Sequence, residues 1–262
     1  MTTYTYADEE TQPRRRRRGR RALIVLLVLL LLLLGLVAVA DRVAASMAEQ
    51  AIADEVQKEL VAQAVQSSPP DVSVGGFPFL TQVLAGEYKS ISIALRDVEG
   101  DVEGNGVRLP RLDVEAREVN APLDTLRTRQ GDITARTVDG TGTIAYASVI
   151  ELINQPGLQL SEENGVLSVT APLRVLGQEV TVRGTAELSV RDGQVLVGFD
   201  DLTAEGVPNT AGARELVEAY AEQLSLELAL PELPFDMQLR DVKAQSDGLA
   251  VTATAQNVPL NQ

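Results

Sequence analysis

Nineteen consecutive uncharged residues, 22–40, form the longest apolar stretch of the chain, and fifteen of them are Leu, Ile or Val. A helix rising ~1.5 Å per residue would span roughly 28 Å over this stretch, close to the ~30 Å hydrocarbon core of a bilayer. Seven arginines lie in the tail before it, whereas Asp41 and Arg42 follow it. By the positive-inside rule, this asymmetry predicts a cytoplasmic basic tail (1–21), a single membrane anchor (22–40) and an extracytoplasmic domain (41–262).

A cleaved signal peptide is the alternative interpretation of the apolar stretch. Ala38-Val39-Ala40 has the small-x-small form of a cleavage site. The stretch is longer than the apolar core of a usual secretory signal, which favours an uncleaved anchor. Under both interpretations the rest of the chain is exported.

Helical periodicity continues beyond the apolar stretch. Five apolar residues recur at helical spacing with charged residues between them: Val43, Met47, Ile52, Val56 and Leu60. This pattern predicts an amphipathic helix over 41–67, continuous with the membrane helix and ended by Pro69-Pro70.

From Val72 onward, apolar and polar residues alternate with a period of two, which predicts strands. The predicted strands include 91–95, 112–114, 133–138, 143–146, 166–175, 180–190, 195–199, 237–244 and 249–255. Asn164-Gly165, Asp192-Gly193 and Asp247-Gly248 are strong hairpin signals. Short connections of this kind predict a mainly antiparallel sheet.

Two helices are predicted among the strands. The first covers 147–154, where Ser148 and Glu151 have the spacing of a capping box. The second covers 210–228, with an apolar stripe of i, i+4 spacing made by Leu216, Tyr220, Leu224 and Leu228. The predicted fold class is therefore α+β: a large, curved, mainly antiparallel sheet wrapped around a long helix, preceded by one N-terminal transmembrane helix.

Composition limits the chemistry of the exported part. The chain has no Cys, no His and no Trp, which excludes thiol nucleophiles, histidine triads and the usual zinc sites. It also lacks a Gly-x-Ser-x-Gly elbow, a Ser-x-x-Lys motif and a phosphate-binding loop. A glycoside hydrolase with paired carboxylates is the rival class, but aromatic platforms for sugar rings are scarce. We therefore predict a protein that is not an enzyme and that has no cofactor.

The charge of the exported part indicates what it does not bind. The chain has 23 basic and 37 acidic residues, and without the tail 16 basic and 34 acidic residues remain, a net charge of −18. Such a surface repels nucleic acid and has no polybasic attraction for anionic lipid head groups. We predict no nucleic acid partner.

The acidic run 97–106 could be interpreted as a calcium loop. With Glu99 as its first position, Pro110 would occupy position twelve, where a side-chain ligand is required. A solvated hairpin turn explains the run more simply, and we predict no metal site.

The segment 75–88, GGFPFLTQVLAGEY, is the most distinctive in the chain and holds three of its aromatic residues. In an extended conformation Phe77 and Phe79 would project to the same face, and Pro78 would mark an edge or a loop. Two interpretations remain open: a strand end that closes the core, or a surface that contacts a ligand.

The string GFPFLTQVLAGEYKSISIALRDV, which begins at Gly76, carries a resemblance to a known family. Together with the anchor before it and the hairpins after it, the string resembles the LmeA-like phospholipid-binding proteins of actinobacterial cell envelopes, over about residues 43–260. The resemblance implies a tubular lipid-binding type of fold, in which a curved sheet wraps a helix around an apolar channel. It also implies phospholipid and the membrane as partners, and a role in lipoglycan elongation beside envelope glycosyltransferases.

The resemblance offers no catalytic residues, and it implies that apolar residues around a channel contact acyl chains, each buried CH₂ contributing ~0.8 kcal/mol. The candidate lipid-binding residues are Phe77, Phe79, Leu80, Leu84, Tyr88, Leu216, Tyr220 and Leu224. Ordinary core packing is the alternative for each of them. A purely structural envelope scaffold, which needs no channel, is the alternative for the protein.

The predicted topology can be tested with protease. Added to spheroplasts, protease should remove the domain and leave the cytoplasmic tail intact, because the arginines before the apolar stretch hold the N-terminus inside. Immunoblotting against tags at both ends would follow the two parts. Protection of the domain in intact spheroplasts would contradict the predicted orientation.

Overall fold

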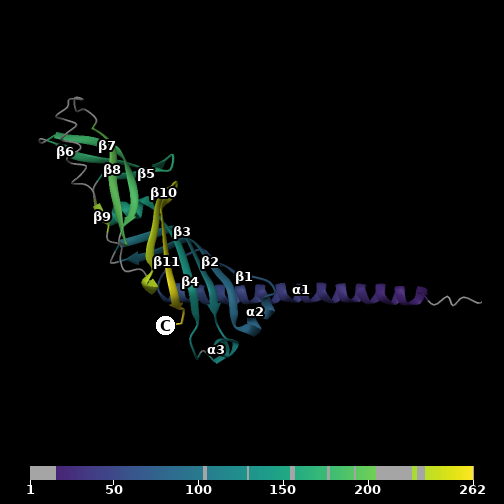
Figure 1. The fold of residues 1–262 in the computed structure, drawn as a ribbon. Coiled ribbons are helices and arrows are strands. Elements are labelled where there is room, and N and C mark those ends of the chain that lie inside the picture. The colour runs from purple at the N-terminus through teal and green to yellow at the C-terminus, as the bar shows by residue number, and fades with distance from the viewer. Residues whose placement is uncertain are drawn as a thin grey trace, which may run out of the picture.

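The computed structural model describes residues 16–102, 105–128, 130–153, 157–175, 178–191, 193–204, 226–228 and 234–261. Its helices are α1 (Arg16–Ala62), α2 (Phe79–Ala85), α3 (Leu123–Thr128), α4 (Tyr146–Ile153) and the 3-10 turn η1 (Pro234–Asp236). Its strands are β1 (Asp71–Gly75), β2 (Glu87–Val102), β3 (Asn105–Asn120), β4 (Thr134–Ile144), β5 (Gln159–Glu163), β6 (Val166–Val175), β7 (Gln178–Arg191), β8 (Gln194–Ala204), β9 (Leu226–Leu228), β10 (Gln238–Gln245) and β11 (Gly248–Pro259). The predicted α+β class is confirmed (Figure 1).

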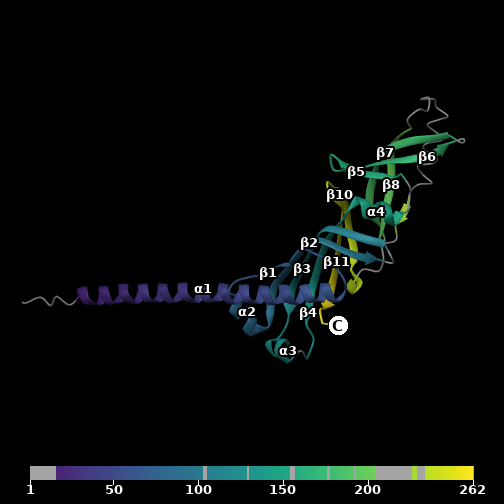
Figure 2. The ribbon, with the colours of Figure 1, turned by 180° about the vertical axis from the view of Figure 1, so that it is seen from behind.

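The strands form two antiparallel sheets where the sequence predicted one large sheet. The first has the order β1-β2-β3-β4-β11-β10, and the second has the order β5-β6-β7-β8-β9. The three predicted hairpins are confirmed, because they join β5 to β6, β7 to β8 and β10 to β11. The second sheet lies on the side of the first sheet away from the start of α1 (Figures 1 and 2).

The single strand β4 covers nearly all of the predicted strand 133–138 and the first two residues of the predicted strand 143–146, which is wrong at its end because Tyr146 begins α4. Gly140 and Gly142 lie inside this strand, and Gly140 has a packing role there. A Cβ atom on Gly140 would lie 3.4 Å from Cε of Met237. The absence of a side chain therefore lets Met237 pack closely over β4.

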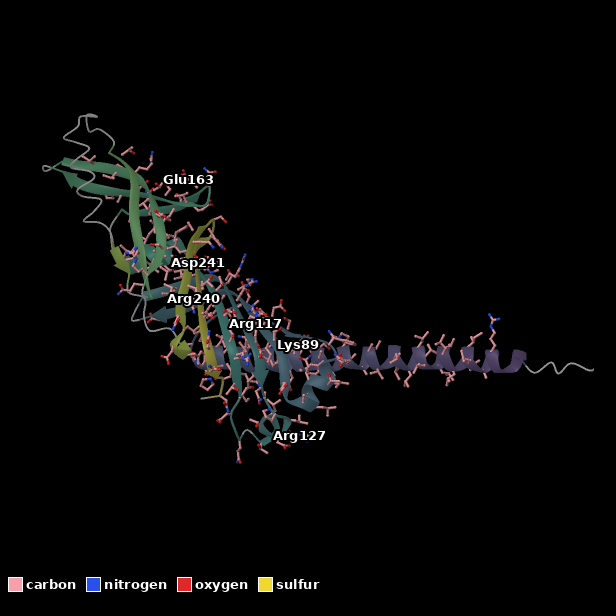
Figure 3. The ribbon with its side chains drawn as sticks, viewed as in Figure 1. Lys89, Arg117, Arg127, Glu163, Arg240 and Asp241 are labelled. Atoms are coloured by element: carbon pink, nitrogen blue, oxygen red, sulfur yellow. The ribbon has the colours of Figure 1, made fainter. Side chains whose placement is uncertain are left out.

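Helix α1 runs without a break from the apolar stretch into the amphipathic segment, as predicted. Its first half projects alone, away from both sheets (Figures 1 and 2), and its apolar side chains extend outward on all sides (Figure 3). Among the described residues, α1 is the helix long and apolar enough to cross a membrane, so it is a candidate anchor or signal. The helix ends at Ala62, before residue 67, and Gln66 then pairs with Glu99 of β2.

The second half of α1 packs on the first sheet and forms one of two hydrophobic clusters. In the first cluster, Ala45 of α1 meets Val74, Val119 and Val258 from strands of the first sheet. The second cluster joins α4, the second sheet and the far ends of β10 and β11: Val149, Leu167, Val169, Ala186, Val195, Val197, Leu239, Val242 and Leu249. The two clusters thus occupy different parts of the molecule.

The predicted helix over 210–228 is wrong at its C-terminal end. Leu226–Leu228 form strand β9, which pairs with β8 and places Leu228 opposite Val195. The sequence Leu-Glu-Leu is compatible with the i, i+4 spacing of a helix and with the period of two of a strand. Backbone pairing with β8 favours the strand. Leu216, Tyr220 and Leu224 lie outside the described residues.

The short predicted helix exists as α4, but its predicted capping box is wrong. The helix begins at Tyr146, so Ser148 lies inside it. The buried Ser148 hydroxyl oxygen instead accepts a hydrogen bond from the backbone N–H of Arg108, 2.9 Å away. Its polar side chain therefore ties α4 to β3.

Asp41 joins α1 to α2. Its carboxylate is 1% exposed and accepts hydrogen bonds from the backbone N–H groups of Phe79, at 3.0 Å, and Leu80, at 2.8 Å. These are the first two residues of α2, so a side chain from α1 provides the cap that Pro78 does not supply. The next residue, Arg42, donates a hydrogen bond to the carbonyl oxygen of Gly76 at 3.3 Å.

The surroundings of Asp41 favour its ionised form. Burial raises the pKa of the carboxyl group, but the hydrogen bonds from Leu80 and Phe79, together with Arg42, lower it by more. The pKa therefore lies below its ordinary value of 3.8. Consequently the stabilising effect of the carboxylate is fully present above pH 3.8 and is lost as the pH falls through the lower value of the folded state.

Replacement of Asp41 should loosen this joint. Asp41→Ala leaves two backbone N–H groups without an acceptor, so we expect the Tm of the detergent-solubilised chain to fall by about 5 °C. Asp41→Asn keeps one acceptor oxygen and should lose less, without the acid dependence of the native carboxylate. Circular dichroism melts of the three proteins at several pH values would measure this. Equal Tm values for Asp41→Ala and the native chain would contradict the role.

Candidate functional site

The segment 76–88 does not have the extended conformation expected from its sequence, because helix α2 begins at Phe79. Phe77 and Phe79 therefore do not share a face. Phe79 is buried against Tyr88, with 6.3 Å between ring centroids, and both belong to the first hydrophobic cluster. Burial also raises the pKa of the Tyr88 hydroxyl. Phe77 instead is 61% exposed, and the guanidinium of Arg42 lies 5.3 Å from its ring centroid.

Helix α2 divides the remaining candidates by face. Its inner face buries Phe79 and Gln82, and Val83 packs against the first cluster. Its outer face presents Leu80 and Leu84, which are 39% and 82% exposed. The described candidates thus form two groups: Phe79 and Tyr88 in the core, and Phe77, Leu80 and Leu84 at the surface.

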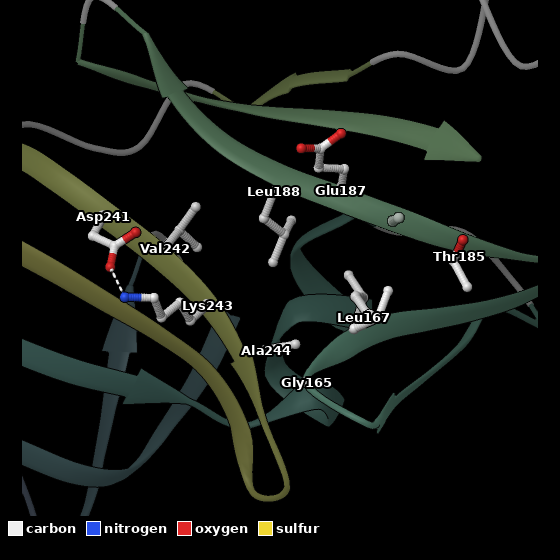
Figure 4. Close-up of a pocket in the computed structure, with 11 residues that line it drawn as sticks. Gly165, Leu167, Thr185, Glu187, Leu188, Asp241, Val242, Lys243 and Ala244 are labelled. Atoms are coloured by element: carbon white, nitrogen blue, oxygen red, sulfur yellow. Dashed lines mark ion pairs between the residues drawn. The ribbon is translucent and has the colours of Figure 1, made fainter.

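A groove lies where β10 passes the second sheet, well away from α2. It has a volume of about 410 Å³, within the ~300–1,000 Å³ common for ligand pockets. Residues from the β5–β6 turn, β6, β7 and β10 line it: Gly165, Val166, Leu167, Thr185, Ala186, Glu187, Leu188, Asp241, Val242, Lys243 and Ala244 (Figure 4). Of the candidates in the described part of the chain, none lines this groove.

The groove combines an apolar floor with a charged rim. Leu167, Ala186 and Val242 on the floor belong to the second hydrophobic cluster. At the rim, Asp241 forms an ion pair with Lys243 (Figure 4), and Glu187 is exposed on β7. This arrangement can hold an apolar chain with a polar end at the rim.

Sequence analysis found the strands that line the groove but not the groove itself. The signal that was available is the apolar side of the predicted strands 166–175, 180–190 and 237–244. Which of those sides face one another depends on how β10 packs against β7, and this packing has no local signature in the sequence.

The acidic run 97–106 lies in the β2–β3 hairpin. Arg108 of β3 pairs with Asp97 at 3.2 Å and with Glu99 at 3.5 Å. Among the described residues, no group of three or more acidic side chains has an arrangement that could hold a metal ion.

The two phenylalanines should respond differently to the same substitution. Phe79→Asp places an unpaired charge in the first cluster, so the domain should not fold. Phe77→Asp changes an exposed side chain, and the Tm should stay within a few degrees of the native value. Circular dichroism of both variants in detergent is the measurement. A folded Phe79→Asp variant, or an unfolded Phe77→Asp variant, would contradict the assigned positions.

Comparison of the sequence with known protein families identifies the family to which this chain belongs. A family model described as LmeA-like phospholipid-binding matches residues 39–254, which include α2, the second sheet, the groove and the first sheet up to the middle of β11. No significant match was found among curated proteins or among solved structures. Because the match covers most of the chain, the protein belongs to the LmeA-like phospholipid-binding family.

Proposed function

We propose that this protein is a membrane-anchored, extracytoplasmic phospholipid-binding protein that holds acyl chains in the groove between β10 and the second sheet. Residues 1–21 are the cytoplasmic tail, 22–40 the single membrane span and 41–262 the lipid-binding domain. The protein serves envelope lipid or lipoglycan assembly, with envelope glycosyltransferases as partners, and it has no catalytic role. Membership of a phospholipid-binding family and the unbroken apolar helix support this proposal.

The observation that carries the proposal is the apolar floor of the groove in a member of this family. Leu167, Ala186 and Val242 form a buried floor, and Val166, which is 43% exposed, and the half-buried Leu188 offer carbon surface to a ligand. The rim carries Glu187 and the Asp241–Lys243 ion pair. The exported part has a net charge of −18, so bulk electrostatics does not attract an anionic head group. The favourable free energy must therefore come from burial of the acyl chain, at ~0.8 kcal/mol per CH₂.

A non-catalytic envelope scaffold is the alternative. Whether lipid remains bound during purification distinguishes a scaffold from a lipid binder. A scaffold purifies without lipid, whereas a binder carries phospholipid that native mass spectrometry detects as a discrete mass increment. Turnover of labelled lipoglycan by the pure protein would instead support an enzyme.

The proposal predicts how affinity depends on the lipid and on salt. Each CH₂ removed from the part of the acyl chain that enters the groove should weaken binding by roughly 0.8 kcal/mol. Added salt should leave affinity nearly unchanged or raise it slightly, because ions screen the repulsion between the acidic domain and an anionic lipid. Affinities for a series of chain lengths at two ionic strengths would measure both effects. Strong weakening by salt with no dependence on chain length would contradict this mechanism.

A pair of matched variants locates the binding in the groove. Ala244→Phe places a phenyl ring among the lining residues and should weaken lipid binding about tenfold by filling space that two or so CH₂ groups would occupy. Ser189→Phe adds a phenyl ring to an exposed position of β7 outside that lining and should leave affinity unchanged. Thermal melts would verify that both variants fold. Equal affinities of the two variants would place the ligand elsewhere.

A further inference from the structure

An exposed apolar surface lies on α2 and the turn before it. It consists of Phe77, Leu80 and Leu84, which are 61%, 39% and 82% exposed, and we call it the α2 surface. Val43 and Met47 on α1 are also exposed, at 53% and 67%. Large apolar side chains that gather at one place on a surface mark a site of contact with a protein or a membrane.

The position of the α2 surface along α1 is fixed by hydrogen bonds. Asp41, the residue after the apolar stretch, accepts the backbone N–H groups of Phe79 and Leu80 at 3.0 and 2.8 Å. Arg42 holds the carbonyl oxygen of Gly76 and lies over the ring of Phe77. Because α1 is unbroken, α2 begins level with the point where the apolar stretch ends, and both views show it beside α1 there (Figures 1 and 2).

That level corresponds to the interfacial layer of a bilayer that holds residues 22–40. The hydrocarbon core is ~30 Å thick and the whole bilayer ~40–45 Å, so an interfacial layer of roughly 5–7 Å lies on each side. One helical residue advances ~1.5 Å, which places Asp41 and the start of α2 inside this layer. Aromatic rings and arginines whose head groups reach the polar layer are the side chains favoured at this depth.

The charge of the segment around the α2 surface is also compatible with contact to a membrane. Residues 72–86 contain no charged residue, although the exported part has a net charge of −18. The carboxylates of Asp41 and Glu49 contact this segment. Asp41 is buried, hydrogen-bonded to the backbone N–H groups of Phe79 and Leu80 and paired with Arg42 at 3.2 Å, and Glu49 accepts a hydrogen bond from the backbone N–H of Val74 in β1 at 2.9 Å. The α2 surface itself therefore consists of apolar side chains, and the carboxylates that contact the segment are engaged by backbone N–H groups.

We propose that Phe77, Leu80 and Leu84 insert into the outer leaflet of the bilayer that holds residues 22–40, and that this second contact fixes the orientation of the domain relative to the membrane. The inference rests on the membrane anchor in the proposed function but not on the groove. The partner of the α2 surface is the bilayer itself, and this contact does not require the domain to extract a lipid from the membrane.

The absence of tryptophan gives a direct test, because a single introduced Trp is the only one in the protein. Phe77→Trp and Leu84→Trp are compared in the full chain, reconstituted in vesicles of phosphatidylcholine and phosphatidylglycerol. The matched control is Phe235→Trp, at a position 52% exposed in η1, which lies by the end of α1 farthest from the apolar stretch (Figures 1 and 2). Lipids brominated near the head group and aqueous acrylamide are the two quenchers.

We expect brominated lipid to quench Phe77→Trp and Leu84→Trp at least about twofold more than Phe235→Trp, and acrylamide to show the reverse order, because interfacial side chains lie ~5–10 Å deep. Equal quenching at all three positions overturns the inference. Protection from acrylamide without quenching by lipid also overturns it, since a second copy or another protein would then cover the α2 surface.

Two further measurements separate this inference from the proposed function. Flotation of each variant with the vesicles tests the anchor alone. Quenching of Phe77→Trp must also persist when Ala244→Phe fills the groove, because contact with the bilayer does not need the groove. Loss of lipid quenching in that double variant would mean that the Trp detects lipid held by the domain, and it would overturn contact with the bilayer.

Discussion

The arrangement of the whole molecule depends on the contact between Asp41 and the first N–H groups of α2. Helix α1 has no break between its apolar and its amphipathic half, so these halves move as one body. A carboxylate buried directly after the apolar stretch makes α2 part of that body, because removing it would leave two backbone donors without an acceptor. The distance of the domain from the end of the apolar stretch is therefore set by hydrogen bonds, not by a flexible linker.

Long strands connect this joint to the groove. Strand β11 contributes Ala255 and Val258 to the first hydrophobic cluster and Leu249 to the second, so one strand takes part in both cores. Its partner β10 contributes Val242 to the floor of the groove. The contact that we propose with the bilayer and the groove that we propose for the acyl chain thus lie in separate parts of one hydrogen-bonded framework.

Sequence patterns predicted the parts of this framework that depend on local periodicity. The continuous α1, strand β6 over 166–175 and the three hairpin turns follow from helical spacing, alternation and Asn-Gly or Asp-Gly pairs. The features that were wrong or missed depend on distant partners. Phe79 begins a helix because Asp41, 38 residues earlier, caps it. Leu226–Leu228 form a strand because β8 offers an edge, and the groove exists because β10 meets β7. Periodicity identifies which residues are buried in an element, but not which element buries them.

The ion pairs of the arginines in the first sheet support our proposal that acyl burial, and not head-group charge, drives lipid binding. Arg117 (Figure 3) pairs with Glu115 on its own strand and with Asp139 on β4, and the pairs Arg96–Asp113 and Arg136–Glu118 also cross neighbouring strands. Exposed pairs of this kind add only ~0–1 kcal/mol each to stability, but they keep these cations from forming a basic patch. Arg42 differs, because its partners are a buried carboxylate, a carbonyl oxygen and an aromatic ring at the end of the apolar stretch. In the arrangement that we propose, a cation held there would meet lipid head groups at the bilayer surface, and the groove would select its ligand by apolar contact.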